Sequence, residues 1–381
     1  MVPGFIGDLP FVAMEYYIYV TKSCNYDCKY CDVVAKAKQS PAGMRLPSVG
    51  KTIDYVLGDK TCSDEEKILV FYGGEPLMNS TFIRECIKRT ENTGMKYLLC
   101  TNGSLLDKAD TTLLQNIHYF FISIDGDPHI HDHYRGGPGS FDLIMHNARD
   151  LKRRVNGMTL ARITLPIAAD ASLYKAVMGV IDSFDYVYCQ IENNEIAYST
   201  ILLEEFKRHF EEDLDRLIKY WVSEMEKGVV KNIVPFQAII SSLMFDRVSN
   251  DLPRCGCGAS IVYLDTDGRC YMCDKLLGKD EFSVGSVHDG TSWRSTSKCT
   301  ELREQCIKCE IRFICGGRCL PQLLYYPDDK FGFYCQIQKI AVQKLNNVLT
   351  TIKGLIASGV VNQSSLDIDV HPIEKCTELM F

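Results

Sequence analysis

The sequence lacks a long apolar run, a secretory signal and an excess of positive charge. No stretch of its 381 residues approaches the ~18 uninterrupted apolar residues that a membrane-spanning helix needs. The N-terminal segment has no basic region followed by an apolar one, so we expect no signal peptide, no membrane contact and a cytoplasmic location. The net charge of −7 argues against nonspecific nucleic-acid binding. Internal repeats are also absent, and the length suits one large domain with a smaller one.

Cysteine, by contrast, is abundant, with 18 residues, and in a reducing cytoplasm this favours metal or redox chemistry over disulfides. Cys24, Cys28 and Cys31 form a C-x3-C-x2-C set directly after the apolar run Met14–Val20. Three thiolates on one loop can hold a [4Fe–4S] cluster and leave one iron open for a substrate or cofactor. Structural zinc is the alternative, but it needs a fourth ligand and none lies nearby.

Apolar runs and helical patterns alternate through the first half of the chain. We expect strands at Met14–Val20, Lys67–Tyr72, Lys96–Cys100, Tyr119–Ile124, Thr159–Leu165 and Tyr186–Ile191. Helices are expected at Ser48–Leu57, Met78–Thr93, Asp107–Asn116, Ser140–Arg154 and Ser172–Ser183. Such alternation predicts an α/β fold with a parallel sheet and right-handed crossovers. Six repeats with unusual residues after the strands predict a partial (β/α)6 TIM-like barrel, with its site at the carboxyl ends of the strands.

The second half changes character. Leu202–Lys227 is a long amphipathic helix whose aromatic stripe we expect to be core, and Pro235–Val248 is a second helix. Ten of the 18 cysteines then fall within the 81 residues Cys255–Cys335, and helix returns from Tyr334 to about Ile356. We therefore expect four parts: a barrel over 12–230, a helical bridge over 231–254, a cysteine-rich domain over 255–336, and a C-terminal helix and tail over 337–381.

The strand ends carry short polar motifs. Gly73-Gly74-Glu75-Pro76 could bring backbone close to a ligand and offer a carboxylate to an ammonium group, or could be a plain strand-to-helix turn. Asn102 follows the third strand, and the segment from Ser123 to Asp125 closes the fourth, where a simple turn is the alternative. Arg135 could fork onto a carboxylate, or could form a surface salt bridge.

With Tyr30 before its last cysteine, the C-x3-C-x2-C motif resembles the signature of the radical S-adenosylmethionine (SAM) enzymes, and G-G-E-P resembles their G-G-E motif. In that family the open iron binds the amino and carboxylate groups of SAM. Electron transfer then cleaves SAM to a 5′-deoxyadenosyl radical, which abstracts a substrate hydrogen. The resemblance implies that SAM contacts come from Tyr30, Gly73, Gly74, Glu75, Pro76, Asn102, Ser123, Asp125 and Arg135.

Three alternating histidines, His129, His131 and His133, lie near this last segment. Only the pair His131-Asp132 matches the H-D-x-x-R stretch of peptide-modifying members of the family. We expect the three to be solvated loop residues rather than metal ligands.

The cysteine-rich part resembles the SPASM extension of radical SAM enzymes. It reads C-x10-G-x4-C from Cys257 through Gly268 to Cys273, then C-x2-C-x5-C-x3-C and a final cysteine. The resemblance implies two further [4Fe–4S] clusters, three in all. One is assigned to Cys306, Cys309, Cys315 and Cys335, the other to Cys257, Cys273 and Cys319 with Cys255 as fourth ligand.

Some assignments in this part stay open. Cys270 is the rival fourth ligand, an open iron is a third alternative, and a zinc ribbon is the alternative to clusters altogether. Cys299 has no assigned role, and Cys376 is expected to be a bystander.

The resemblance implies an enzyme that modifies a peptide or protein, by oxidative crosslinking or related C–H functionalisation of a ribosomally made precursor. The alternative is sulfatase maturation to formylglycine, favoured by the absence of a leader-binding domain before the first strand and by Asp274 directly after Cys273. In sulfatase-maturing enzymes an Asp at the matching place removes a proton, a role that burial could support. A reductase, ferredoxin or flavodoxin is the expected electron donor. A ferredoxin-type electron carrier is an alternative of another class, but such a protein needs no SAM site, so the G-G-E-P motif argues against it.

Overall fold

A computed structural model describes residues 14–31, 33, 48–194, 196–245, 255–258, 260–288 and 302–367. The expectations for the N-terminal segment, for Cys299 and for Cys376 fall outside these residues. Within them, no helix is both long and apolar enough to cross a membrane.

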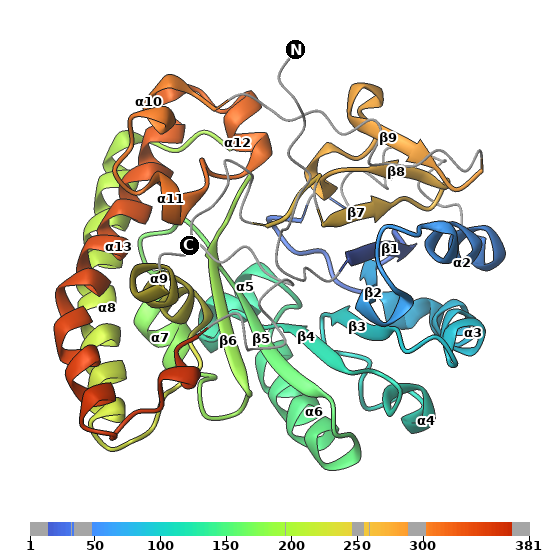
Figure 1. Cartoon of the computed structure of the whole chain (residues 1–381), viewed down its shortest axis with the longest axis horizontal. Coiled ribbons are helices and arrows are strands. Elements are labelled where there is room, and N and C mark those ends of the chain that lie inside the picture. The colour runs from blue at the N-terminus through green and yellow to red at the C-terminus, as the bar shows by residue number, and fades with distance from the viewer. Residues whose placement is uncertain are drawn as a thin grey trace.

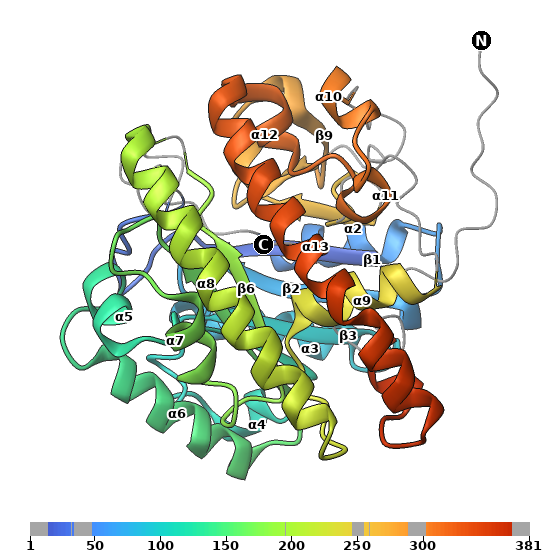
Figure 2. The same cartoon turned by 90° about the vertical axis from the view of Figure 1, so that its left-hand side faces the viewer.

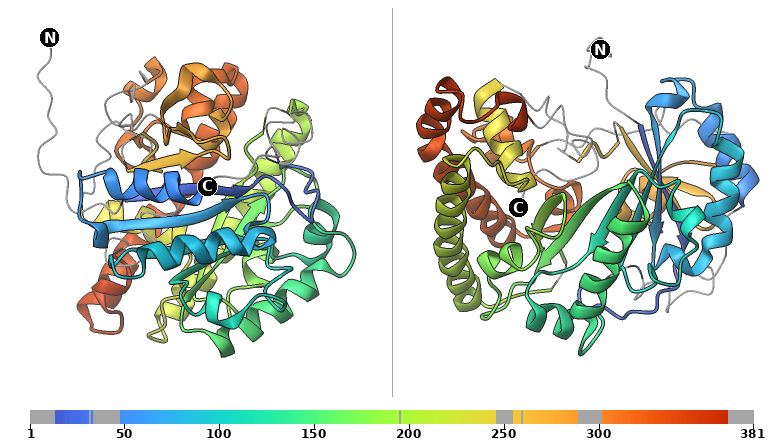
Figure 3. Two further views of the ribbon diagram at one scale, coloured as in Figure 1. Left: turned by 90° about the vertical axis from the view of Figure 1, so that its right-hand side faces the viewer. Right: turned by 90° about the horizontal axis from the view of Figure 1, so that it is seen from below.

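Six parallel strands form the predicted barrel sheet. They are β1 (Met14–Thr21), β2 (Lys67–Gly73), β3 (Lys96–Thr101), β4 (Tyr119–Ser123), β5 (Met158–Leu165) and β6 (Tyr186–Ile191), paired in chain order. Their connections carry α2 (Val49–Gly58), α3 (Ser80–Thr90), α4 (Thr111–Leu114), α5 (Pro128–Tyr134), α6 (Ser140–Arg154) and α7 (Leu173–Met178). The sheet curves with helices on its convex side and does not close (Figures 1 and 3). The predicted fold class is confirmed.

Three short strands continue this sheet beyond β1. They are β7 (Ile261–Leu264), β8 (Arg269–Tyr271) and β9 (Ser283–Ser286). Strand β7 runs parallel to β1, with Ile18 opposite Leu264, and β8 and β9 follow as antiparallel neighbours. The cysteine-rich part is thus hydrogen-bonded into the barrel sheet. The sequence did not predict this arrangement, because strands of three or four residues are too short to show a recognisable pattern.

Helices close the other side of the molecule. These are α8 (Thr200–Met225), α9 (Val234–Phe245), α10 (Glu304–Ile307), α11 (Arg312–Cys315), α12 (Leu320–Tyr325) and α13 (Asp328–Ala357), where α8 and α13 lie side by side (Figures 1 and 2). Phe206 and Phe333 pack between them, with ring centroids 6.0 Å apart. Trp221 is fully buried, and its indole N–H donates to the carbonyl of Lys231 at 2.7 Å. The aromatic stripe of α8 is therefore core, as predicted.

Short 3-10 turns occupy Asp64–Glu66, Pro76–Asn79, Asp274–Leu276, Asp280–Phe282 and Gln363–Ser365.

The histidine segment is helical, which corrects the expectation of a solvated loop. Asp127 caps α5, since its carboxylate accepts from the backbone N–H of His129 at 2.9 Å, and Pro128 occupies the first turn. His131 is fully buried, and its Nδ1 accepts from the backbone N–H of Asp125 at 3.1 Å. The expectation holds for His129, whose side chain is exposed.

Candidate active site

A cavity of about 280 Å³ lies at the carboxyl ends of the barrel strands. Its walls come both from the barrel and from the cysteine-rich part. They include Cys24, Cys28, Cys31, Tyr72, Gly73, Gly74, Cys100, Asn102, Ser123, Arg135, Arg162, Cys255, Cys257, Cys273, Asp274, Cys315 and Cys319. This is the edge at which the sequence predicted the site.

The two glycines of G-G-E-P let β2 approach the cysteine loop. The backbone N–H of Gly74 donates to the carbonyl of Thr21, and that of Glu75 donates to the carbonyl of Ser23, both at 2.8 Å. A Cβ on Gly73 would stand 2.2 Å from the Thr21 carbonyl oxygen, and one on Gly74 would stand 2.1 Å from that of Ser23. Any larger residue would push the loop away from the strand.

Glu75 lies beneath the cavity and holds β3 to β2. Its buried carboxylate accepts from Thr101 Oγ1 at 2.9 Å and from the backbone N–H groups of Asn102 and Leu77 at 2.8 and 3.1 Å. Burial raises the pKa of this carboxyl to about 6. Pro76 starts the 3-10 turn that follows. A contact between Glu75 and SAM stays a prediction, because protein donors occupy both of its oxygens.

Asn102 supports the cysteine loop from the third strand. Its Nδ2 donates to Asn25 Oδ1 at 2.9 Å and lies 3.7 Å from the sulfur of Cys24. Its Oδ1 accepts from the backbone and side chain of Ser104. The loop that bears the first thiols is thereby held from both β2 and β3.

Tyr30, Asp125 and Arg135 form one buried group beside the loop. The Tyr30 hydroxyl donates to Asp125 Oδ2 at 2.6 Å, and Arg135 Nε donates to the same oxygen at 3.0 Å. The backbone N–H of Thr164 donates to Asp125 Oδ1 at 3.1 Å. The side chain of Arg135 is 8% exposed and that of Asp125 is 0% exposed, so the surface-salt-bridge interpretation of Arg135 is wrong.

Two of the first three thiols, Cys24 and Cys28, lie where ionisation is unfavourable without a cation. Burial raises the pKa of Cys24, and burial raises that of Cys28 to about 11, with Cys31 and Cys24 adding to the effect. A bound metal centre reverses this balance, since coordinating thiols are deprotonated outright.

Cys306, Cys309, Cys315 and Cys335 act on one another, as do Cys255, Cys257 and Cys273, while the place of Cys319 in the second set stays a prediction. Burial raises the pKa of Cys335 to about 12, and Cys315, Cys306 and Cys309 raise it further. In the second set, contacts with Cys255 and Cys273 raise the pKa of Cys257, followed by burial. Cys319 borders the same cavity as these three.

Cys270 does not stand with the second set. It lies buried in β8, is not part of the cavity wall, and is not among the groups that shift the pKa of Cys257 or Cys273. This favours Cys255 over Cys270 as the fourth ligand, which stays a prediction.

The assignment of these thiols to clusters rather than to single ions stays a prediction. Across the described ranges, no three His, Cys, Asp or Glu side chains are arranged to hold one metal ion. Structural zinc requires such a compact tetrahedral set, whereas a four-iron cluster binds each cysteine at a separate iron and keeps the sulfurs farther apart.

Asp274 begins a 3-10 turn in the cavity wall, beside a group of tyrosines. Its Oδ2 lies 3.4 Å from the Tyr72 hydroxyl, and its Oδ1 accepts from the backbone N–H of Lys275 at 2.8 Å. Burial, with Asp274 adding to it, raises the pKa of Tyr72 and Tyr263 well above the usual value. Both tyrosines are therefore neutral, and the Tyr72 hydroxyl donates toward this carboxylate.

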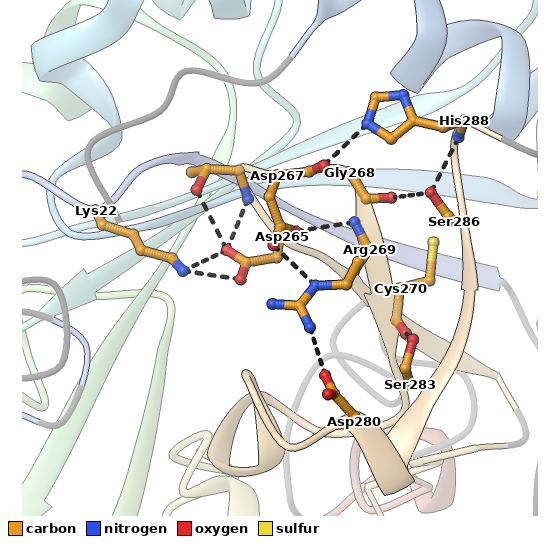
Figure 4. A network of polar contacts seen from close by, with 11 residues as sticks. Lys22, Asp265, Asp267, Gly268, Arg269, Cys270, Asp280, Ser283, Ser286 and His288 are labelled. Atoms are coloured by element: carbon orange, nitrogen blue, oxygen red, sulfur yellow. Dashed lines mark hydrogen bonds and ion pairs between the residues drawn. The ribbon is translucent and has the colours of Figure 1, made fainter. Parts of the chain in front are cut away.

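The sequence motifs missed Tyr72, Arg162 and the ion pair of Lys22 with Asp265. Figure 4 shows Lys22, two residues before Cys24, directed at the Asp265 carboxylate. Gly268 makes the turn after Asp265 at φ 87°, where a Cβ would stand 2.5 Å from His288 Nε2, which explains the glycine of C-x10-G-x4-C. Tyr72 and Arg162 could have been found only by working out which residues of β2 and β5 face the inside of the barrel.

Residues 18–170 match the family model described as the Radical SAM superfamily. An AdoMet-dependent heme synthase of Oleidesulfovibrio alaskensis is 23% identical, over 78% of this chain and 80% of the relative. A cysteine-type anaerobic sulfatase-maturating enzyme of Clostridium novyi is 24% identical, over 71% of this chain and 75% of the relative. The radical SAM cyclopropyl synthase TigE of Paramaledivibacter caminithermalis is 22% identical, over 86% and 73%.

Solved structures share the fold. The structure of anSMEcpe with bound AdoMet has a TM-score of 0.69 at 17% identity, covering 94% of this chain and 99% of that one. Streptococcus suis SuiB bound to the precursor peptide SuiA has a TM-score of 0.54 at 12% identity, covering 81% of this chain and 72% of that one. Both comparisons extend beyond the barrel into the cysteine-rich part.

Proposed function

Because this chain is a radical SAM enzyme, built on a superfamily domain over residues 18–170, we propose that it modifies a peptide or protein by oxidative C–H functionalisation, such as crosslinking within a ribosomally made precursor. Membership implies SAM and one [4Fe–4S] cluster. The finer assignment of three clusters, and the ligands named above, belong to the proposal.

One observation carries it: the first thiol loop and the Cys255, Cys257, Cys273 and Cys319 set border a single cavity, and Asp274 is part of the same wall. When bound, the first cluster with SAM supplies a radical that removes a substrate hydrogen atom, and the auxiliary clusters supply a route for the second electron of an oxidation. Asp274 is in position to accept the proton that such an oxidation releases.

The chain's own residues divide the remaining work. The backbone N–H groups of Gly74 and Glu75 hold the thiol loop, and the group of Tyr30, Asp125 and Arg135 forms the adjoining wall. Arg135 donates its Nε–H to Asp125, and we propose that its two terminal nitrogens bind the SAM carboxylate. Asn102 and Ser123 line the cavity nearby and are proposed to contact SAM.

A peptide or protein substrate is favoured by the sulfatase-maturating relative, whose name gives a protein as its substrate. The TigE and sulfatase-maturating names denote a cyclopropyl synthase and a maturase, and they match most of this chain. Heme synthase is also among the names, so the names alone do not select the substrate. Sulfatase maturation to formylglycine is the second candidate, favoured by Asp274 directly after Cys273. A ferredoxin, flavodoxin or reductase would deliver the electron.

The test is anaerobic reconstitution with iron and sulfide, followed by dithionite and SAM. The expected result is 5′-deoxyadenosine and about twelve irons per chain. Replacing Cys24, Cys28 and Cys31 together by Ala should abolish SAM cleavage and leave about eight irons. Cys62→Ala, outside all three sets, is the matched control and should change neither value. Absence of 5′-deoxyadenosine from the wild type contradicts the enzyme reaction, and iron near four with added zinc contradicts the auxiliary clusters.

A further inference from the structure

Arg162 places a positive charge inside the barrel. It lies on β5, opposite Ser123 of β4 and Tyr188 of β6, and its side chain lines the cavity. A guanidinium stays protonated at any pH at which the protein is folded, so this charge cannot be removed by titration.

No protein group neutralises this charge in the part of the chain that the structure describes. The guanidinium of Arg162 makes no hydrogen bond or ion pair there, whereas that of Arg135 in the same cavity is paired with Asp125 at 3.0 Å. The groups that act on Arg162 electrostatically are Tyr72, Cys100, Tyr188 and Tyr17. Burial raises the pKa of Tyr72 well above its usual value and that of Cys100 to about 12, so both are neutral near pH 7.

An unpaired charge in such a place is costly once water leaves. Burying an isolated ion in a medium of low polarity is strongly unfavourable unless a partner of opposite charge is supplied. When a substrate covers the cavity, water is expelled, and the Arg162 guanidinium then needs a partner of opposite charge. A carboxylate is the best such partner, because the planar guanidinium can donate to both carboxylate oxygens at once.

Arg162 has neighbours on two sides of the cavity. It stands opposite Ser123, a proposed SAM contact. It also acts on Tyr72, whose hydroxyl lies 3.4 Å from Asp274 Oδ2. The charge therefore lies in the wall that also carries Asp274, where the reacting residue of the substrate would be processed.

We propose that Arg162 binds a carboxylate of the substrate, supplied by an acidic side chain close to the residue that is modified. This rests on the proposed function and narrows its substrates to peptides with Asp or Glu near the reacting position. Arg162 is then a specificity-determining residue, and the proton-accepting role stays with Asp274.

The test measures binding of short probes to the reconstituted, SAM-loaded enzyme under anaerobic conditions. The probes are an end-capped Ala-Glu-Ala peptide, its Ala-Gln-Ala counterpart, and tri-alanine with a free carboxyl end. A charge-assisted pair predicts that the wild type binds the Glu probe about tenfold or more tightly than the Gln probe. In Arg162→Gln this ratio should fall to about one, and Arg162→Lys should give an intermediate value. Stronger binding of the free-carboxyl probe than of the Glu probe would assign the site to a chain terminus instead and overturn the side-chain proposal.

Two further measurements keep the outcomes separate. SAM-dependent 5′-deoxyadenosine formation should persist in Arg162→Gln, and loss of SAM binding in that variant would assign Arg162 to SAM and overturn the proposal. The thermal stability of Arg162→Gln should equal or exceed that of the wild type, since an unpaired charge is removed; a clear loss would make Arg162 structural. Arg84→Gln, an exposed arginine paired with Asp110, is the control and should leave the probe ratio unchanged. Equal binding of the Glu and Gln probes by a wild type that cleaves SAM refutes the role of Arg162 alone, whereas a wild type that makes no 5′-deoxyadenosine refutes the proposed function.

Discussion

Lys22 and Asp265 form an ion pair across 243 residues of sequence, with the lysine Nζ 2.6 and 2.8 Å from the two carboxylate oxygens. Lys22 stands two residues before the first thiol, and Asp265 directly follows β7 (Figure 4). Asp265 is 4% exposed and Lys22 is 17% exposed, so the pair is largely shielded from water. The loop of the first thiols is thereby fixed to the hairpin that leads to Cys273.

Removing the acid of this pair should destabilise the protein. Asp265→Asn leaves the Lys22 ammonium without its partner in a largely buried place, and we expect a loss of about 2–3 kcal/mol in the free energy of unfolding. Glu212→Gln breaks the exposed pair with Arg208 and should change it by no more than about 0.5 kcal/mol. Chemical denaturation under anaerobic conditions measures both. If adding Lys22→Met to Asp265→Asn produces a full second loss, the two residues act independently and the ion pair is not the reason.

Gly74→Ala should release the thiol loop. The new Cβ would stand 2.1 Å from the Ser23 carbonyl oxygen, so the loop must move by more than a side-chain adjustment can absorb. We expect the loss of one cluster, about four irons, together with SAM cleavage, while the remaining irons are retained. Gly58→Ala meets nothing within 4 Å and should keep the full iron content. Full iron and normal 5′-deoxyadenosine formation in Gly74→Ala would show that the loop tolerates the displacement.

The barrel elements were predictable because long, periodic segments carry their own signal. Both α6 (Ser140–Arg154) and β6 (Tyr186–Ile191) have the predicted bounds. The helix α4 is much shorter than the predicted Asp107–Asn116, because Asp110 caps it by accepting from the backbone N–H of Thr112 at 2.9 Å. Helix propensity alone predicted a start that was too early, because the capping side chain of Asp110 fixes where the helix begins.

The thiols were predictable from spacing alone, whereas Arg162, Lys22 and Asp265 were not. Cysteine spacing is a local property of the chain, and the structure brings the same cysteines together. The importance of Arg162 depends on which face of β5 turns inward and on which residues the other strands bring near it, and neither can be read from spacing. The pairing of Lys22 depends on β7 adding to β1, which nothing in either segment records.

The buried His131 predicts a loss of stability in acid. Burial lowers its pKa to about 4, with Arg135 adding to the effect. The folded state thus holds the neutral ring, and the stability it contributes is complete above the unfolded value near pH 6.5 and is lost as the pH falls toward about 4. Between pH 7.5 and 5 we expect a decrease of about 2 kcal/mol that can be assigned to this residue.

Denaturation curves of the wild type and of His131→Gln at the two pH values check this decrease. The variant should lack that part of the pH dependence, whereas the exposed His129→Gln should keep it. The same acid sensitivity in His131→Gln and the wild type would mean that other groups control it.

Asp274→Asn tests the proton-accepting role. The amide keeps the size of the carboxylate and the contact with the Lys275 N–H, but it cannot accept a proton. With a substrate in hand, the variant should still cleave SAM and still transfer deuterium from a deuterated substrate to 5′-deoxyadenosine, since hydrogen abstraction comes first. Product should fall by about 10²–10⁴-fold, the usual cost of losing a general base.

Two comparison variants make this result specific to Asp274. Asp280→Asn alters an exposed carboxylate paired with Arg269 and should form product at the wild-type rate. Tyr72→Phe removes the hydroxyl that lies 3.4 Å from Asp274 Oδ2, and because that contact is long, it should cost much less than loss of the carboxylate itself. If Asp274→Asn forms product normally while Tyr72→Phe does not, the phenol rather than the carboxylate handles the proton. If neither variant slows product formation, the proton leaves through another group of the cavity wall, and Asp274 serves only to begin the turn after Cys273.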